Sequence, residues 1–300
     1  YTYTKKNGFG VSMGNIAING FGRIGRSILR IIIESNSPLN VVAINDLGNY
    51  ENLAYLLKHD SVMGVLDADV SLDGNKLKVN ERTIDLISIK NPKDLPWKEH
   101  NVDVVIESTG IFRDSESLNM HIKAGAKKVL LTVLTKDEID ATIVLGVNND
   151  DLNSDHKIVS NASCTTNGLA PVAKILHEKF GIDRGLLTTV HAYTNSQKTV
   201  DTAAGNLRDA RAAALNIVPA GTGAAKAVGL VIPELQGKFT GMAFRVPVPT
   251  VSVVDFTATL GKEASPEEIN AAMKTAAEGP LKGILRYSEQ QLVSTDLRGD

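Results

Sequence analysis

Hydrophobic residues in the first half of the chain follow two periods that alternate along the sequence. Short apolar runs typical of buried strands occupy residues 16–18, 41–45, 102–107, 128–131, 142–147 and 158–160. Between the first two runs, residues 23–34 place Ile24, Ile28, Leu29 and Ile32 at helical spacing, which predicts one apolar helix face. Short strands separated by helices indicate parallel βαβ units.

Residues 65–89 differ from this pattern. Apolar and polar positions alternate there, and Asp73-Gly74 has the composition of a hairpin turn. The segment therefore predicts antiparallel strands inserted among the parallel units.

The second half of the chain mixes helices with longer strands. We expect a helix at 166–180, a strand at 186–191, a loop at 194–206, alternating strands within 242–260 and a strand-like stretch at 291–296. Ser265-Pro266-Glu267-Glu268 forms a capping box with proline at the first helical position, which predicts the start of a helix running to 278. This mixture favours an α+β second domain.

Composition and charge narrow the function classes. In 300 residues, Lys plus Arg is 32 and Asp plus Glu is 34, so the net charge is 32 − 34 = −2, which argues against a nucleic-acid partner. No apolar run reaches the length of a membrane span, and no apolar core of a signal peptide follows Lys5-Lys6. The single cysteine excludes an intrachain disulfide and a multi-cysteine zinc site. We expect a cytoplasmic protein with neither a metal nor a membrane partner.

A glycine motif opens the first helix. Residues 16–25 read IAINGFGRIG, so G-x-G-x-x-G follows a strand and begins a helix, and Asp46 ends the next strand. Gly20 allows a tight turn, Gly22 allows close approach of a pyrophosphate, and Gly25 allows the helix to pack on the strand. Asp46 would bind the adenosine ribose and repel the extra phosphate of NADP. The candidate cofactor site comprises Asn19, Gly20, Phe21, Gly22, Arg23, Ile24, Gly25 and Asp46. The alternative is a structural turn followed by a solvated aspartate.

Cys164 lies in the segment SNASCTTN (160–167), at a predicted strand-to-helix transition. The helix N-terminus favours the thiolate, and a neighbouring imidazole would favour it further. His191 is the best candidate because it ends an apolar strand, whereas His177 lies within a helix. The other four histidines lie in polar surroundings: His59, His100, His121 and His156. The alternative for Cys164 is a small buried hydrophobic residue.

Five segments together resemble the phosphorylating glyceraldehyde-3-phosphate dehydrogenase family, over Met13 to Asp300. They are INGFGRIGR, SNASCTTN, HAYTNSQ, GTGAAKA and FRVPVPTVSVVDF. The resemblance implies a Rossmann dinucleotide-binding domain at 13–162 and an α+β catalytic domain with a mainly antiparallel sheet at 163–300. It also implies NAD as cofactor, a homotetramer and a role in glycolysis. The family continues beyond residue 300 with a helix, and Met13 is the expected natural start.

The resemblance also implies roles for individual residues. Cys164 adds to the aldehyde, His191 acts as base, and a thioester forms that inorganic phosphate cleaves. The substrate phosphate is bound by Thr194 and Arg245. Inorganic phosphate is bound by Ser163, Thr165, Thr222 and Gly223. Thr132 lies near the nicotinamide, although Thr132-Val133-Leu134 departs from the usual Ser-Ala-Pro.

Three other functions remain open on the sequence. Erythrose-4-phosphate dehydrogenase uses the same thiol chemistry, although Gly168-Leu169-Ala170-Pro171 favours the triose phosphate enzyme. An inactive NAD-binding relative would keep the glycine motif alone. A thiol hydrolase would need Cys164 and His191 but not the glycines.

Overall fold

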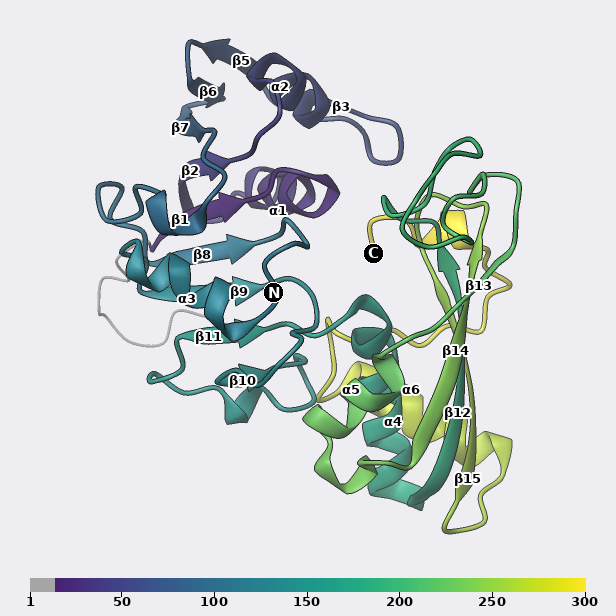
Figure 1. Ribbon diagram of the computed structural model, residues 1–300. Coiled ribbons are helices and arrows are strands. Elements are labelled where there is room, and N and C mark those ends of the chain that lie inside the picture. Colours follow the sequence, from purple (N-terminus) through teal and green to yellow (C-terminus); the bar gives the residue numbers. More distant parts are fainter. Residues whose placement is uncertain (1–13) are drawn as a thin grey trace. The chain divides into compact units, whose positions relative to one another are not determined.

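The computed structural model describes residues 14–300, so the expected start at Met13 lies outside the described residues. The chain divides into two compact units (Figure 1). The first runs to Thr142 and includes Asp151–Ala162, and the second comprises Ile143–Asp150 and Ser163–Asp300.

A nine-stranded sheet forms the centre of the first unit. Its strands, in spatial order, are β10 (Ala141–Thr142), β11 (Ile158–Ser160), β9 (Lys128–Leu131), β8 (Val104–Glu107), β1 (Asn15–Asn19), β2 (Asn40–Asn45), β7 (Arg82–Ile87), β6 (Lys76–Val79) and β5 (Val70–Asp73). The pairings from β10 to β7 are all parallel. Because β1 lies between β2 and β8, strand order reverses there, which is where such sheets bind ligands.

Both faces of this sheet are buried, as a parallel sheet requires. Ile18 of β1 packs on one face with Leu29 of α1 (Arg23–Glu34). Ala17 of the same strand packs on the other face with Trp97 and Val105. The remaining helices of the unit are α2 (Tyr50–Lys58) and α3 (Ser115–Lys123). The predicted βαβ arrangement is confirmed.

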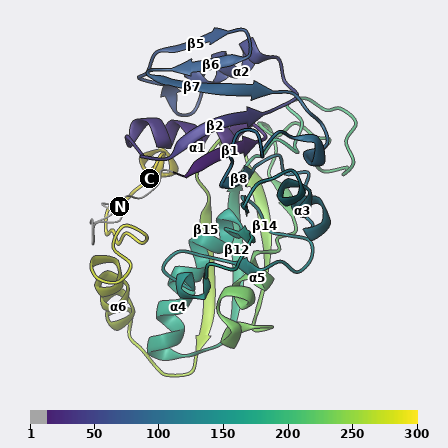
Figure 2. The ribbon, with the colours of Figure 1, turned by 90° about the vertical axis from the view of Figure 1, so that its left-hand side faces the viewer.

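The antiparallel strands predicted within 65–89 are also confirmed. β5 pairs with β6 and β6 with β7, each antiparallel, and Gly74 in the turn has φ +59°. Since β7 also pairs in parallel with β2, this meander extends the main sheet, and α2 lies against β5 (Figure 2). A short hairpin, β3 (His59–Asp60) with β4 (Gly64–Val65), follows α2.

Two predicted strands are wrong. The strand expected at 142–147 ends at Thr142, and residues 143–150 belong to the second unit. The apolar run is still buried there, with Val144 1% exposed, but Asn148 Oδ1 accepts the Val144 N–H and Lys174 Nζ donates to Val147 O. Side chains thus replace a strand partner. The stretch at 291–296 is not a strand, and Ser294–Leu297 is a 3-10 turn.

The second unit has a four-stranded sheet covered on one face by helices. Its strands, in order, are β13 (Val218–Ala220), β14 (Phe239–Val246), β12 (Ile182–Ala192) and β15 (Val253–Leu260). Only the β12–β14 pair is parallel, so the sheet is mainly antiparallel as predicted. Helices α4 (Cys164–Phe180) and α5 (Ala224–Val231) pack on β15 and β14.

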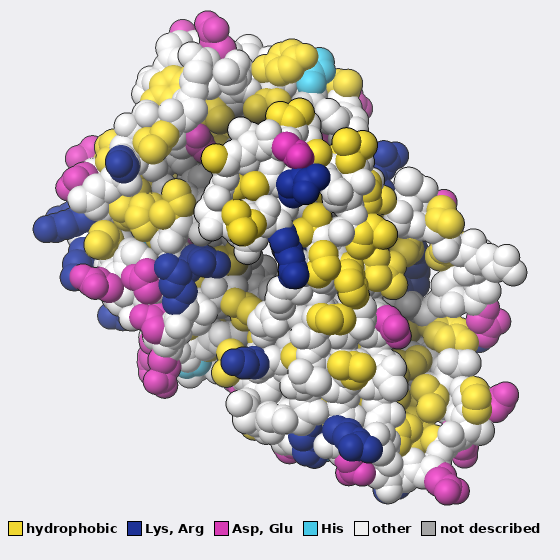
Figure 3. Space-filling view, turned by 45° about the vertical axis from the view of Figure 1, so that its right-hand side comes forward, with side chains coloured by type: hydrophobic (Ala, Val, Ile, Leu, Met, Phe, Trp, Pro, Cys, Tyr) yellow, Lys and Arg dark blue, Asp and Glu magenta, His cyan; other side chains and the backbone are white. Residues whose placement is uncertain are grey.

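The opposite face of this sheet is exposed. Leu187 is fully buried, whereas its neighbour Leu186, pointing the other way, is 52% exposed. Met242 and Val253 are exposed as well. Hydrophobic side chains gather in patches on the surface view rather than occurring singly (Figure 3).

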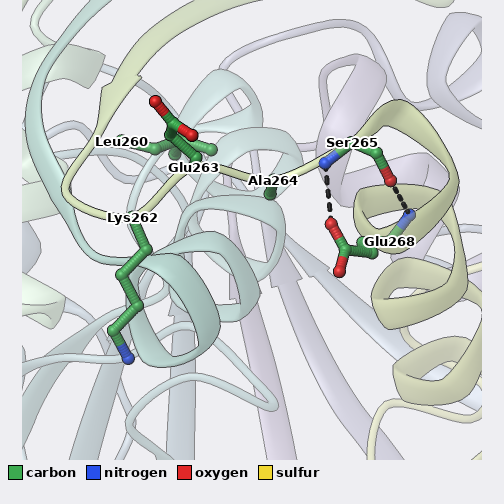
Figure 4. A pocket seen from close by; sticks show the side chains of 6 residues that line it. All are labelled: Leu260, Lys262, Glu263, Ala264, Ser265 and Glu268. Carbon is green, nitrogen blue, oxygen red and sulfur yellow. Dashed lines mark hydrogen bonds between the residues drawn. The ribbon is translucent and has the colours of Figure 1, made fainter.

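The capping box predicted at Ser265 is present at the start of α6 (Pro266–Glu278). Ser265 Oγ accepts the Glu268 N–H, and Glu268 Oε2 accepts the Ser265 N–H (Figure 4). The hollow beside it, lined by Leu260, Lys262 and Glu263 among others, contains none of the predicted site residues. Within residues 14–300, no helix has both the length and the apolarity needed to cross a membrane.

Candidate active site

The glycine motif forms a tight turn between β1 and α1. Gly20 has φ +91°, and a Cβ built on it would lie 2.6 Å from Thr109 N. A Cβ on Gly25 would lie 2.3 Å from Gly20 O. Both positions therefore require glycine, as the sequence predicted.

Gly22 is different, because no atom of residues 14–300 outside its chain neighbours and its own helix backbone lies within 4 Å of its Cβ position. It is the N-cap of α1, and no side chain caps the helix. The first-turn N–H groups of a helix have no acceptor within the helix, so an uncapped helix start with open space at its N-cap fits a pyrophosphate. Ile24 is half exposed, and Arg23 is ion-paired with Asp60. The Phe21 ring is fully buried in the core, so only the backbone of Phe21 is available near the turn.

Asp46 is held at the end of β2 by backbone donors. Phe21 N donates to its Oδ2 at 2.7 Å, and Gly48 N donates to its Oδ1 at 2.8 Å. A carboxylate has about four acceptor positions, so two remain for hydroxyl groups. Asp46 is thus fixed to the turn itself, and the alternative of a merely solvated aspartate does not apply.

A buried polar cluster that was not predicted from the sequence lies behind the turn. Glu107 is fully buried and accepts hydrogen bonds from Asn19 Nδ2 at 2.5 Å, from His121 Nε2 at 3.0 Å, and from the N–H and Oγ1 of Thr109. Trp97 Nε1 donates to His121 Nδ1 at 2.9 Å. His121, which was expected in polar surroundings, has polar partners, but it is 0% exposed and lies in the core.

This cluster accounts for Asn19. Its side chain is 1% exposed, donates to Glu107 and accepts from Asn45 Nδ2 at 2.7 Å. Its carbonyl accepts the Ser108 N–H. Asn19 thus braces the turn from within. The sequence signal was an acidic residue, Glu107, ending the strand run VVIE, which ought to be apolar throughout.

In the second unit, Cys164 is the first residue of α4. Ser163 is the N-cap, and its Oγ accepts the Thr166 N–H at 3.1 Å. The thiol is exposed, so Cys164 is not a buried hydrophobic residue. Thr165, next in the helix, is buried.

His191 lies beside the thiol. Its Nε2 is 3.2 Å from Cys164 Sγ. This hydrogen bond lowers the pKa of the thiol; desolvation opposes the shift, and the charge of His191 and the N–H and hydroxyl of Thr165 lower the pKa further. The predicted thiol–imidazole pair therefore forms within one unit, and it lowers the pKa of the thiol.

Arg245 contacts the other side of His191. Its Nη1 lies 2.7 Å from His191 Nδ1 and donates to Ala192 O at 3.2 Å. Nδ1 itself is 2.7 Å from the same carbonyl oxygen. Arg245 is half-buried, and within the described residues its hydrogen-bond partners are His191 and Ala192 O rather than an acid, so it does not form a surface salt bridge there.

The remaining predicted site residues occupy loops and helix starts. Thr194 follows β12, and its Oγ1 lies 3.3 Å from Ser196 Oγ. Thr222 and Gly223 precede α5, where Thr222 Oγ1 accepts the Ala224 N–H and α5 packs against α4. Thr132 belongs to the first unit, and its hydroxyl donates to Glu107 O.

A dinucleotide-binding turn in one unit and a thiol–imidazole pair in the other define a thiol-dependent oxidoreductase that uses a nicotinamide dinucleotide. Comparison with known proteins narrows the class. A family model described as glyceraldehyde 3-phosphate dehydrogenase, NAD binding domain, matches residues 14–115. A second, for the C-terminal domain of the same enzyme, matches residues 163–300.

The chain belongs to the glyceraldehyde-3-phosphate dehydrogenase family. It is 56% identical to glyceraldehyde-3-phosphate dehydrogenase of Geobacillus stearothermophilus over 95% of this chain and 84% of that one. It is 54% identical to glyceraldehyde-3-phosphate dehydrogenase 2 of Trichormus variabilis over 96% of this chain and 86% of that one. It is also 54% identical to glyceraldehyde-3-phosphate dehydrogenase 1 of Bacillus subtilis over 95% of this chain and 85% of that one. The protein is an NAD-dependent oxidoreductase.

Proposed function

We propose that the protein oxidises D-glyceraldehyde-3-phosphate with NAD and inorganic phosphate to 1,3-bisphosphoglycerate, as a step of glycolysis. The observation that carries this proposal is the Cys164–His191 pair, with Sγ and Nε2 3.2 Å apart at the start of α4. A thiol at that position is both nucleophilic and a good leaving group, as acyl transfer to phosphate requires.

The chain's own residues supply the covalent chemistry. Cys164 Sγ bonds to the aldehyde carbon, and the thiol proton passes to His191 Nε2. NAD held by the first unit would supply the acceptor for the hydride that this carbon loses, and Cys164 Sγ would then carry the product as a thioester. A phosphate oxygen attacks the thioester carbon, the C–S bond breaks, and the thiolate is restored beside His191.

Residues of the first unit hold the cofactor. The N–H groups after Gly22 bind the pyrophosphate, and Asp46 binds the ribose hydroxyls with its two remaining acceptor positions. Asn19, Gly20, Phe21 and Gly25 shape the turn, with Arg23 and Ile24 at its surface. Thr132 completes the nicotinamide end of the site.

Two anion sites serve the two phosphates. Arg245 and Thr194 bind the substrate phosphate, since a guanidinium offers a permanent charge and several donors. Inorganic phosphate is bound by hydroxyl and backbone N–H donors of Ser163, Thr165, Thr222 and Gly223. These four lie at the starts of α4 and α5, where helix N-termini favour anions.

The assembly is a homotetramer. Its support is the apolar sheet face that carries Leu186, Met242 and Val253, because an exposed patch of this kind usually marks an interface. The proposed location is the cytoplasm, where an exposed catalytic thiol stays reduced. Light scattering of the purified protein tests the assembly.

Reduced-cofactor absorbance in a mixture of protein, NAD, glyceraldehyde-3-phosphate and inorganic phosphate tests the activity. Turnover should require phosphate and vanish in Cys164→Ser. Turnover without phosphate would refute the phosphorylating reaction, and equal efficiency with erythrose-4-phosphate would refute the substrate. An intact protein that binds NAD but shows no turnover would support an inactive relative.

A matched pair of variants tests the cofactor site. Gly22→Ala adds a methyl group where the protein leaves open space, so it should weaken NAD binding by about tenfold or more without changing stability. Gly14→Ala is the control, because Gly14 precedes the other end of β1 and its Cβ position meets Asp103 at an ordinary 3.6 Å and nothing closer in the described part of the chain. Equal NAD affinity in both variants would refute the assigned pyrophosphate site.

A further inference from the structure

His191 Nδ1 has two partners that compete for it. The carbonyl oxygen of Ala192 lies 2.7 Å away and can accept a proton from the ring. Nη1 of Arg245 also lies 2.7 Å away and can only donate. One ring nitrogen cannot donate to the first and accept from the second at the same time.

The backbone builds this competition into the fold. His191 and Arg245 are paired in register on the parallel strands β12 and β14, so their side chains share a face. The Ala192–Tyr193 peptide, which carries this carbonyl, is held in place because the Tyr193 N–H donates to Val248 O at 3.1 Å. The carbonyl therefore cannot easily turn away from the ring.

The surroundings of the ring contain few other charges. In the described part of the chain, the titratable or charged groups that contact His191 are Cys164 on α4 and Arg245 on β14. The neighbours on the same face beside β12 are Ser252, just before β15, and Val254 of β15, and both are uncharged. The position of the ring proton thus depends on these two partners and on the Ala192 carbonyl.

Two proton arrangements follow for the neutral ring. If Arg245 donates to Nδ1, the ring proton is on Nε2, which faces Cys164 Sγ and cannot accept the thiol proton. If Arg245 is drawn away, Nδ1 carries the proton and donates it to Ala192 O. Nε2 then presents a lone pair to the thiol and can act as a base.

We propose that Arg245 is a positioning residue that sets the proton of His191, and that a phosphate group bound to Arg245 switches His191 into its basic form. The phosphate is that of the substrate if the proposed function holds. In the switched form, the Sγ–H proton moves to Nε2, which leaves a thiolate beside an imidazolium whose Nδ1–H is bound to Ala192 O. The base is therefore activated by the substrate that needs it.

The expected shift in the pKa of the Cys164 thiol is opposite to the shift that a simple charge effect would produce. Removing a cation, or adding an anion near Cys164, would raise the pKa of the thiol by electrostatics alone. Release of His191 Nδ1 would instead make the thiolate form at lower pH. The direction of the change therefore decides between the two.

The first test measures the rate of Cys164 alkylation by iodoacetamide, a neutral reagent, as a function of pH. Arg245→Met should lower the midpoint by about one pH unit, because methionine cannot donate to Nδ1. Arg184→Met is the matched control: Arg184 is on the same strand as His191 and hydrogen-bonds Thr259 instead, so its midpoint should match the parent's. A midpoint that stays or rises in Arg245→Met would overturn the proposal.

The second test adds inorganic phosphate as the anion. Phosphate should lower the alkylation midpoint of the parent protein and have no effect on Arg245→Met. A phosphate response that persists in Arg245→Met would refute the role of Arg245, because it would arise at another anion site. No response in the parent would refute it as well.

The ring proton can be observed directly by nitrogen NMR of protein labelled at histidine, with His191→Asn to assign the signal. The proton should be on Nε2 without phosphate and on Nδ1 with it. The same form under both conditions would overturn the proposal. These measurements use neither NAD nor aldehyde, so an enzyme with normal phosphate-dependent turnover and an unchanged ring proton would refute this inference while the proposed function stands.

Discussion

Two histidines of this protein lie in hydrogen-bonded clusters of opposite character. His121 is fully buried, accepts from Trp97 Nε1 and faces Glu107 with Nε2, so only one proton arrangement satisfies every partner. His191 is half-buried, and its Nδ1 has both a donor and an acceptor within 2.7 Å. The first cluster braces the glycine turn, and the second holds the nucleophile.

The difference shows what burial demands of polar groups. A buried carboxylate is tolerated only when its hydrogen bonds are complete, and such a cluster has no freedom left to change. A cluster open to solvent can leave one atom, such as His191 Nδ1, between a donor and an acceptor at little cost in stability, because water can satisfy the partner that is not bonded. We therefore expect His121 variants to change stability and His191 variants to change reactivity.

The largest expected effect is from breaking the buried cluster. Glu107→Leu leaves the donors of Asn19, Thr109 and His121 buried without an acceptor, so the free energy of unfolding should fall by about 4 kcal/mol. Urea unfolding followed by the fluorescence of Trp97, the single tryptophan, measures it. A loss below about 1 kcal/mol would mean that the donors find other partners.

Next in size is the loss of the base from the open cluster. His191→Asn should lower turnover by about a hundredfold while stability changes by no more than about 0.5 kcal/mol. Because His191 lowers the pKa of Cys164, its removal should shift the alkylation midpoint to higher pH. An unchanged midpoint would contradict the pairing of Sγ with Nε2.

A smaller effect tests whether the proton arrangement at His121 is unique. Glu107→Gln places an amide N–H₂ among the donors and should cost about 2 kcal/mol of stability. Trp97→Phe frees His121 Nδ1 to carry the proton, so the ring can then accept from the glutamine amide. The double variant should therefore lose less than the sum of the two single variants. If calorimetry shows that the stability losses of the two single variants simply add in the double variant, the His121 ring can change its proton arrangement without losing Trp97 as a partner.

The smallest effect calibrates the others. Ser265→Ala removes the N-cap of α6, away from both histidines, and should cost about 1 kcal/mol with no change in turnover or alkylation. Thr275→Ala, in the last turn of the same helix, is the control, because its hydroxyl only donates to a backbone carbonyl within the helix. A change in turnover in either variant would show that turnover depends on the overall stability of the protein, so that the two measurements are not independent.

Local pattern was enough to predict much of the fold. The helix Arg23–Glu34 and the strands Lys128–Leu131 and Ile158–Ser160 have the predicted bounds, because their periodicity and the residues at their ends agree. The strand expected at 142–147 failed because burial alone produces the same apolar run. Side-chain donors and acceptors from α4 and the following turn took the place of a neighbouring strand.

The candidate site divides in the same way. Gly20 and Gly25 were predicted because sterics act over a few residues, and Cys164 because the start of its helix is local. Glu107 and His121 were missed because the partners Asn19 and His121 lie 88 and 14 residues from Glu107. The one local signal, an acidic residue at the end of the run VVIE, does not identify those partners.

The sequence by itself determined the order of strands and helices, the turn that only glycine can form, and the placement of one thiol at a helix start. These depend on backbone sterics and short-range hydrogen bonds, which act between neighbours in the chain. Only the tertiary structure decided which partners the polar side chains have. The register of β12 with β14 places Arg245 against His191, and the β1–β8 pairing places Asn19 against Glu107. Hydrogen bonds of this kind require atoms of segments distant in the sequence to be positioned to within a fraction of an ångström. Those positions are fixed only once the strands are paired.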